Sequence, residues 1–186
     1  KNHKSIHNVD LWFGLYVNKI SVFKTRTYTM AHLAYMTIIG KKQDLISKGC
    51  NSHDSMGSKA QLAHMDEITV YAVGHDLMKI SSNLPKENGT FSITKLVDKS
   101  SPLLGTAFSN QEHLDCEIKF YRTNDRGFNE QHYTIKLTQA VISAISLNLP
   151  HVQISNDEEL HEIISFRYKD ITWEHNTSGT SGYDVW

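Results

Sequence analysis

Histidines and carboxylates are the side chains of this sequence that could bind a metal ion or transfer protons, and eleven histidines are present. The segment His161-Glu162-Ile163-Ile164-Ser165 begins like the zinc-protease pattern H-E-x-x-H, but serine stands where that pattern needs its second histidine. The segment also has the pattern of a strand, which lacks the helical spacing that directs two ligands to one ion. The sequence therefore predicts no metal site at this segment.

Three further groups of residues carry reactive side chains without completing a site. The segment His113-Leu114-Asp115-Cys116 holds three possible metal ligands, but the start of a strand with a buried cysteine accounts for them. Glu174 and His175 would act as a pair only if the fold brought a nucleophile near, because adjacent strand residues face opposite sides. The segment Gly179-Thr180-Ser181-Gly182 follows a strand pattern, and no helix pattern that could bind phosphate follows it. We therefore predict no enzyme, no metal and no cofactor.

Charge is unevenly distributed along the 186 residues. The chain has 19 basic and 20 acidic residues, yet residues 1–29 have a net charge of +4 and residues 30–186 one of −5. A protein that neutralises many phosphates would be basic, so this balance argues against nucleic acid as the partner.

Residues 1–29 have the features of an extension foreign to the folded unit, which we expect to span residues 30–186. Their longest apolar run, residues 11–17, is too short to cross a bilayer, so no membrane insertion is predicted. Charges on both sides of this run and the poor cleavage sequence at residues 25–29 argue against a cleavable signal peptide.

Cys50 and Cys116 are the only cysteines. A small secreted disulfide scaffold would contain more of them. The sequence favours two reduced thiols that act as small apolar side chains, and it leaves a disulfide between them open.

Alternating apolar and polar residues predict several strands. The segment 68–73 is rich in β-branched and aromatic residues, and 116–121 alternates strictly. Residues 133–149 alternate over the greatest length, which predicts either one long strand or a strand that bends and continues. In 163–173 apolar residues recur at even-numbered positions before Lys169 and at odd-numbered positions after it. This switch of phase predicts a β-bulge or a strand end.

One hairpin and one helix complete the predicted elements. Turn residues at 123–127 join two alternating runs and predict a hairpin. Ser101 is predicted as an N-cap with Pro102 at the first helical position, and apolar residues recur at helical spacing after it. These signals predict a helix over 102–112. Many strands with one helix predict a mainly β fold, a two-sheet β-barrel or sandwich with one mid-chain α-helix.

Seven ordered stretches of residues 30–186 carry a resemblance to a known family. They are Ala34-Tyr35-Met36-Thr37-Ile38-Ile39-Gly40, Gln43-Asp44-Leu45-Ile46-Ser47-Lys48-Gly49-Cys50, Ser52-His53-Asp54-Ser55-Met56-Gly57, Asp98-Lys99-Ser100-Ser101-Pro102-Leu103-Leu104, Leu114-Asp115-Cys116-Glu117-Ile118-Lys119-Phe120-Tyr121-Arg122-Thr123, Tyr133-Thr134-Ile135-Lys136-Leu137 and Trp173-Glu174-His175-Asn176-Thr177-Ser178-Gly179-Thr180-Ser181-Gly182-Tyr183-Asp184-Val185-Trp186. Together they resemble the haemolysin-coregulated protein (Hcp) family, the tube subunit of the bacterial type VI secretion system.

The resemblance implies two β-sheets with one helix, and a homohexameric ring that stacks into a tube inside a contractile sheath. It also implies that the tube leaves the cytoplasm with a spike, without a cleavable signal peptide, and that effectors travel in its lumen. The implied partners are therefore other copies of the chain, the sheath, the spike and effector proteins. Some relatives carry glycine after Gln43 where this sequence has Asp44, so the local turn is predicted to differ.

Two turn-rich segments are the predicted subunit contacts, the extended loop 41–62 and the stretch 174–186. Their candidate residues are Gln43, Asp44, Ser52, Asp54, Ser55, Glu174, His175, Thr180, Ser181 and Tyr183. Polar residues at the end of the helix are candidates to face cargo in the lumen, namely Asn110, Gln111 and Glu112.

Two alternatives to a tube subunit stay open at this stage. A secreted Hcp-like effector or adaptor would keep the fold and use residues 1–29 to bind a partner protein. A monomeric β-barrel enzyme or ligand-binding protein would use the histidines.

Overall fold

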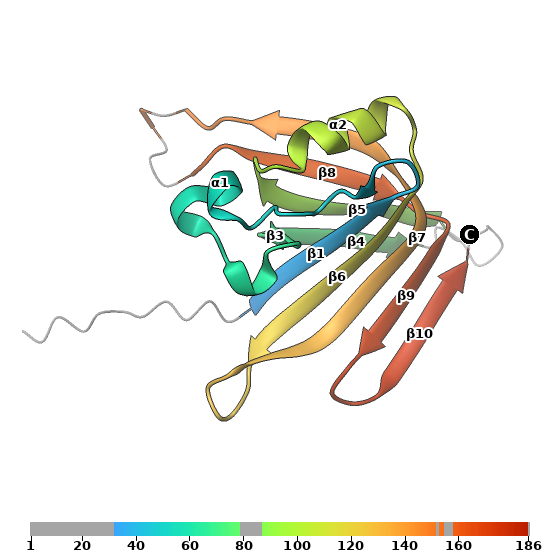
Figure 1. The fold of residues 1–186 in the computed structure, drawn as a ribbon. Helices are drawn as coiled ribbons and strands as arrows, with labels where there is room; N and C mark the ends of the chain where they lie inside the picture. Colours follow the sequence, from blue (N-terminus) through green and yellow to red (C-terminus); the bar gives the residue numbers. More distant parts are fainter. Residues whose placement is uncertain (1–31, 79–86, 152, 155–157, 186) are drawn as a thin grey trace, which may run out of the picture.

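The computed structural model describes residues 32–78, 87–151, 153–154 and 158–185, so the predicted extension of residues 1–29 lies outside it. Strands dominate the fold (Figure 1). In chain order they are β1 (His32–Gly40), β2 (Asp44–Leu45), β3 (Ile68–Val70), β4 (Ala72–Met78), β5 (Glu87–Leu96), β6 (Leu114–Thr123), β7 (Asn129–Asn148), β8 (His161–Arg167), β9 (Asp170–His175) and β10 (Thr180–Val185). The helical elements are α1 (His53–Met56), the 3-10 turns η1 (Gly57–Lys59) and η2 (Leu62–His64), and α2 (Ser101–Ser109).

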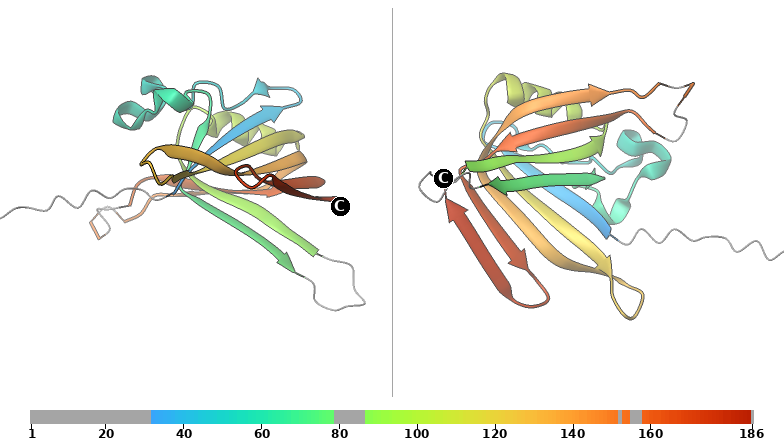
Figure 2. Two further views of the ribbon diagram at one scale, coloured as in Figure 1. Left: turned by 90° about the horizontal axis from the view of Figure 1, so that it is seen from below. Right: turned by 180° about the vertical axis from the view of Figure 1, so that it is seen from behind.

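The strands form two antiparallel sheets that share β7 (Figures 1 and 2). In the first sheet β1 pairs with β2 and β3 on one side and with β6 on the other, and the order continues through β7 and β9 to β10. The second sheet has the order β7-β8-β5-β4. Among the described residues the two ends of this network do not pair with each other. The mainly β prediction is therefore confirmed, and a two-sheet sandwich describes it better than a closed barrel.

Strand β7 is long because it belongs to both sheets. Residues 129–140 pair with β6, residues 133–138 also pair with β9, and residues 141–148 pair with β8. Between these halves Gln139 has a φ of 51°, and its amide donates to Asp115 Oδ1 over 3.1 Å. The second of the two predicted forms, a strand that bends and continues, is therefore the one observed.

The predicted phase switch near Lys169 is a strand end. β8 ends at Arg167 and pairs with the second half of β7, whereas β9 begins at Asp170 and pairs with the first half. The chain thus crosses from one sheet to the other at Tyr168 and Lys169. The run at 68–73 is divided in the same way, since β3 pairs with β1 and β4 pairs with β5. The hairpin predicted at 123–127 joins β6 to β7 and is confirmed.

The core lies between the sheets and follows from their alternation. Every second residue of β6 points inward, beginning with Leu114, Cys116 and Ile118. The fully buried members from other elements include Met36, Ile38, Ile68, Phe91, Ile93, Leu104, Ile164, Phe166 and Ile171. Burial of this number of aliphatic and aromatic side chains is the main favourable term in folding.

Helix α2 packs on β7 through Leu104 and Ala107. It begins one residue before the prediction, because Ser100 is the N-cap and Ser101 is the first helical residue. It also ends at Ser109 rather than at residue 112. The chain leaves the helix there in a Schellman arrangement, in which Gln111 has a φ of 49° and the Glu112 amide donates to Ala107 over 2.9 Å.

Candidate assembly surface

The segment 41–67 lies beside the strands of the first sheet at one end of the molecule, with α1, η1 and η2 in it (Figure 1). The sequence predicted an extended loop over 41–62. The structure corrects this prediction, because α1, η1 and the start of η2 lie within that range. The helical turns form because local hydrogen bonds between residues three or four positions apart pair the backbone N–H and C=O groups of the segment. One of them joins the Met56 amide to the Ser52 carbonyl over 2.9 Å.

Glu112 holds the start of this segment. Its Oε1 accepts the amides of Lys42 and Gln43 over 2.6 and 2.9 Å, and its Oε2 accepts Gln43 Nε2 over 2.9 Å. Gly40 leaves room for the carboxylate, since a Cβ at that residue would lie 2.5 Å from Glu112 Oε1. Burial raises the pKa of Glu112, but the bonds from Gln43 and Lys42 outweigh it and hold the pKa below its ordinary value.

Asn51 holds the middle of the segment and is 1% exposed. Its Nδ2 donates to the carbonyls of His64 and Glu67 over 3.2 and 2.9 Å, and its Oδ1 accepts Thr69 Oγ1 over 2.9 Å. The side chain thus adds to the backbone hydrogen bonds of the segment and ties Asn51 to His64, Glu67 and Thr69.

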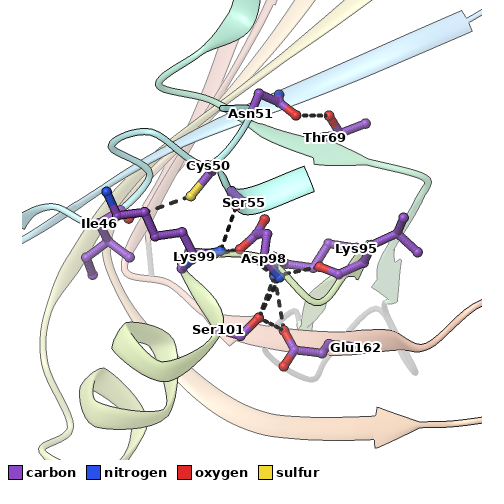
Figure 3. Close-up of polar contacts among 12 residues, drawn as sticks. Ile46, Cys50, Asn51, Ser55, Thr69, Lys95, Asp98, Lys99, Ser101 and Glu162 are labelled. Atoms are coloured by element: carbon purple, nitrogen blue, oxygen red, sulfur yellow. Dashed lines mark hydrogen bonds and ion pairs between the residues drawn. The ribbon is translucent and has the colours of Figure 1, made fainter. Parts of the chain in front are cut away.

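A buried ionic cluster fixes the neighbouring elements (Figure 3). Lys95 on β5 is 0% exposed, and its Nζ lies 3.0 Å from Asp98 Oδ1 and 3.1 Å from Glu162 Oε2 on β8. Ser101 Oγ accepts Lys95 Nζ over 3.0 Å and donates to Glu162 over 2.9 Å. The cluster therefore joins β5, β8 and the first turn of α2, and it uses the Ser101 hydroxyl that was predicted to cap the helix.

The third anchor of the segment is an aromatic and ionic contact with the first sheet. The His64 ring stacks on Tyr35 with 3.6 Å between centroids, and its Nδ1 lies 2.5 Å from Glu67 Oε2. Glu67 Oε1 accepts Lys119 Nζ over 2.8 Å. Burial raises the pKa of Glu67, yet hydrogen bonds from Lys119 and His64 keep it below its ordinary value. The sequence did not reveal this contact, because its members come from β1, η2 and β6.

The predicted contact residues of this segment divide into two groups. Gln43, Ser52 and Ser55 are partly buried and hold the segment itself, since Ser52 Oγ donates to Gly49 over 2.8 Å and Ser55 Oγ accepts the Lys99 amide over 2.9 Å (Figure 3). The two acidic candidates, Asp44 and Asp54, are exposed.

The C-terminal candidates lie on the hairpin of β9 and β10. Glu174 on β9 pairs with Lys136 Nζ over 3.0 Å, and His175 is partly buried beside it. On β10, Thr180 and Ser181 are exposed, and Tyr183 is 79% exposed. In the described residues β10 pairs with β9 alone, so it is an edge strand of the first sheet.

The lumen candidates are only partly in accord with the structure. Asn110 and Gln111 are exposed at the end of α2. The expectation that Glu112 is exposed to cargo is wrong, because this carboxylate is 3% exposed and accepts the bonds described above.

The reactive residues of the sequence have structural partners. His161 and Glu162 lie on β8, where His161 Nδ1 bonds Glu159 O over 2.8 Å and Glu162 joins the buried cluster. Asp115 bonds Lys41 Nζ over 3.0 Å. Cys50 and Cys116 are buried and free, which decides the open question of a disulfide. No three histidine, cysteine or acidic side chains gather as metal ligands within the described residues.

Apolar side chains are exposed at several edges and ends of the fold. Strand ends and loops contribute Leu77 and Met78 at 54 and 59% exposure, Leu147 and Leu149 at 63 and 66%, and Phe128 at 68%. These side chains come from different elements, such as Leu77 and Met78 on β4, Leu147 on β7 and Tyr183 on β10. Exposed apolar side chains that occur singly are normal on a protein surface, so they do not by themselves mark a contact.

The fold is that of a β-sandwich protein, and comparisons with known proteins specify the family. The family model described as "Type VI secretion system effector, Hcp" matches residues 24–175. The "Major exported protein" of Pseudomonas aeruginosa is 37% identical over 166 residues, which are 84% of this chain and 96% of that protein. This chain therefore belongs to the Hcp family of the type VI secretion system.

Solved structures agree with this assignment. One described as the crystal structure of Hcp protein has a TM-score of 0.80 at 33% identity, over 84% of this chain and 98% of that chain. The secreted protein Hcp3 from Pseudomonas aeruginosa has a TM-score of 0.75 at 38% identity, over 84% of this chain and 99% of that chain. In the described part of this chain, none of the helices has the length and apolar character needed to span a membrane.

Proposed function

We propose that this chain is a non-catalytic tube subunit, which forms homohexameric rings that stack into the expelled tube of a type VI secretion system. The observation that carries the proposal is the Hcp family match over residues 24–175. Edge strand β10 supports it, because the unpaired edge of a strand can pair with a strand of another copy.

The ring must close by head-to-tail contacts that join two different surfaces of one chain. We assign these surfaces to the segment 41–67 and the hairpin of β9 and β10, in line with the candidate residues. The anchors at Glu112, Asn51 and His64 make the segment a rigid surface, which lowers the conformational entropy lost on association.

The chain is proposed to act in the cytoplasm first and outside the cell after export, as a relative named major exported protein suggests. Sheath, spike and effector proteins are its proposed partners, with effectors held in the lumen near Asn110 and Gln111.

Light scattering after size exclusion, with electron microscopy of the same fractions, tests the proposal. We expect a mass of six copies and ring-shaped particles. A chain that stays monomeric at high concentration would contradict the tube function. Deleting residues 44–58 should abolish the ring or its stacking, and unchanged rings and stacks would show that this segment makes neither contact.

A further inference from the structure

A groove runs between α1 and η1 on one side and the link from β5 to α2 on the other. Two adjoining cavities of about 350 and 410 Å³ form it, and both are lined by Ser55 and Val97. Its apolar lining includes Met56, Val97 and Leu160, of which the last two are each 38% exposed.

Polar groups stand at the two ends of this groove. Lys59 and Glu159 form an ion pair at one end, and Ser52, Asp54 and Lys99 line the other. The site thus suits an amphipathic side chain, with an apolar body in the middle and a hydroxyl directed to a polar end.

Tyr183 on β10 is such a side chain, and it is 79% exposed. β10 lies far from α1 in each of the three views of Figures 1 and 2. Within one chain the tyrosine therefore cannot reach the groove. In a head-to-tail contact, however, a projection on one side of each copy meets a recess on the other side of the next.

We infer that Tyr183 of one copy inserts into the groove of a second copy and is the anchor of the ring contact. The inference rests on the proposed function and specifies its interface. Tyrosine is enriched among residues that dominate binding energy, and burying its ring covers Met56, Val97 and Leu160 at the same time.

A larger cavity of about 540 Å³ beside η2 is the competing recess. It is lined by Glu67 and Lys119, which are already ion-paired, and by the exposed Leu62 and Met65. The exposed lining of this cavity is mainly polar, whereas that of the groove is mainly apolar, and an aromatic ring is buried more favourably against an apolar lining. The groove with Met56 is therefore the better site for Tyr183.

Photocrosslinking of the full-length chain distinguishes the two recesses. A benzophenone amino acid in place of Tyr183 keeps an aromatic side chain and reacts with nearby C–H groups. Mass spectrometry of the irradiated assembly should find crosslinks between copies at Met56, Val97 or Leu160. Crosslinks at Met65 or Leu62 instead would overturn the inference, and because each recess contains one methionine the comparison is matched.

Substitutions give a second readout. Tyr183→Ala should raise the concentration needed for half-assembly at least about ten-fold, as loss of a dominant contact does, whereas Tyr183→Phe should keep most of the association. Val97→Trp should have the effect of Tyr183→Ala by filling the groove. Phe128→Ala removes another exposed aromatic ring and should leave assembly unchanged.

Circular dichroism of each variant should match that of the original chain, so that loss of assembly is not loss of folding. If the original chain forms rings and Tyr183→Ala forms them equally well, the inference is wrong while the proposed function stands. If the original chain forms no rings, the proposed function fails and the inference fails with it.

Discussion

At the scale of single residues, a left-handed backbone occurs at Asp44, which has a φ of 53°. The sequence predicted that the turn at Asp44 differs from that of relatives with glycine at this position. In the structure, however, Asp44 has the positive φ that glycine favours. Asp and Asn enter this region more readily than other side chains, because their short polar groups bond locally. The same turn can therefore form with either residue.

Substitutions at Asp44 test this conformation. Asp44→Gly should leave the free energy of unfolding unchanged or raise it by up to about 1 kcal/mol, because glycine has no Cβ penalty at positive φ. Asp44→Val should lower it by about 1–2 kcal/mol. Urea unfolding measures both, with Asp44→Asn as the control that should resemble the original. Equal stability of the Gly and Val variants would show that φ is not positive in solution.

Glu112 provides a pH-dependent prediction. Its pKa in the folded chain lies below its ordinary value, so its charged form stabilises the fold above about pH 4.5, and this stability is lost as the pH falls through the folded pKa. Glu112→Gln should lower the free energy of unfolding at pH 7 by about 1–3 kcal/mol, because bonds to a charged acceptor are lost.

The pH dependence is the diagnostic part of this experiment. Urea unfolding from pH 7 down to pH 3 should show the gap between Glu112→Gln and the original chain narrowing below about pH 4.5. A gap that stays constant over this range would mean that the charge of Glu112 does not hold residues 42 and 43. Asn110→Ala, at an exposed position of the same turn, should change stability little at any pH.

At the scale of elements, the bends of the sheet are set by pairing rather than by local sequence. β7 has the alternation of one continuous strand, yet its halves belong to different sheets. Likewise the run at 68–73 divides at Tyr71 because β3 pairs with β1 while β4 pairs with β5. Alternation predicts which side chains share a face, but it contains no information on which partner strand lies alongside.

The cluster at Lys95 gives the prediction at this scale. Lys95→Met should lower the free energy of unfolding by about 3–5 kcal/mol, because Asp98 and Glu162 would stay buried without their cation. The triple variant Lys95→Met, Asp98→Asn, Glu162→Gln should recover part of this loss. Urea unfolding measures both, and a triple variant no better than the single one would show that charge is not the cause.

At the scale of the whole molecule, the sequence predicts that the folded domain begins at residue 30 and that residues 1–29 are an extension outside it. These residues carry a net charge of +4, opposite in sign to the remainder. The buried anchors described above all lie within residues 35–162. We therefore propose that the domain needs only residues 30–186.

Removal of residues 1–29 tests this proposal. The shortened chain should unfold at the same urea concentration as the longer chain and assemble at the same protein concentration, since it keeps every anchor and proposed contact found in the described residues. Light scattering and urea unfolding of both chains provide the comparison. A shortened chain that assembles less well would instead favour a partner-binding role for residues 1–29.

The sequence by itself determined the mainly β class, the hairpin at 123–127, the approximate helix and the family, because alternation, turn residues and an ordered set of motifs are local properties. Only the tertiary structure decided that Glu112 is buried, that Lys95 joins two strands and a helix, and that His64 stacks on Tyr35. The pairs that make these contacts long-range lie 29 positions apart for Tyr35 and His64, 67 for Lys95 and Glu162, and 70 for Lys42 and Glu112. The near-neutral net charge of the chain likewise gave no indication of the buried ion pairs. Composition gives only the number of charged residues, and the fold determines which of them lie close together.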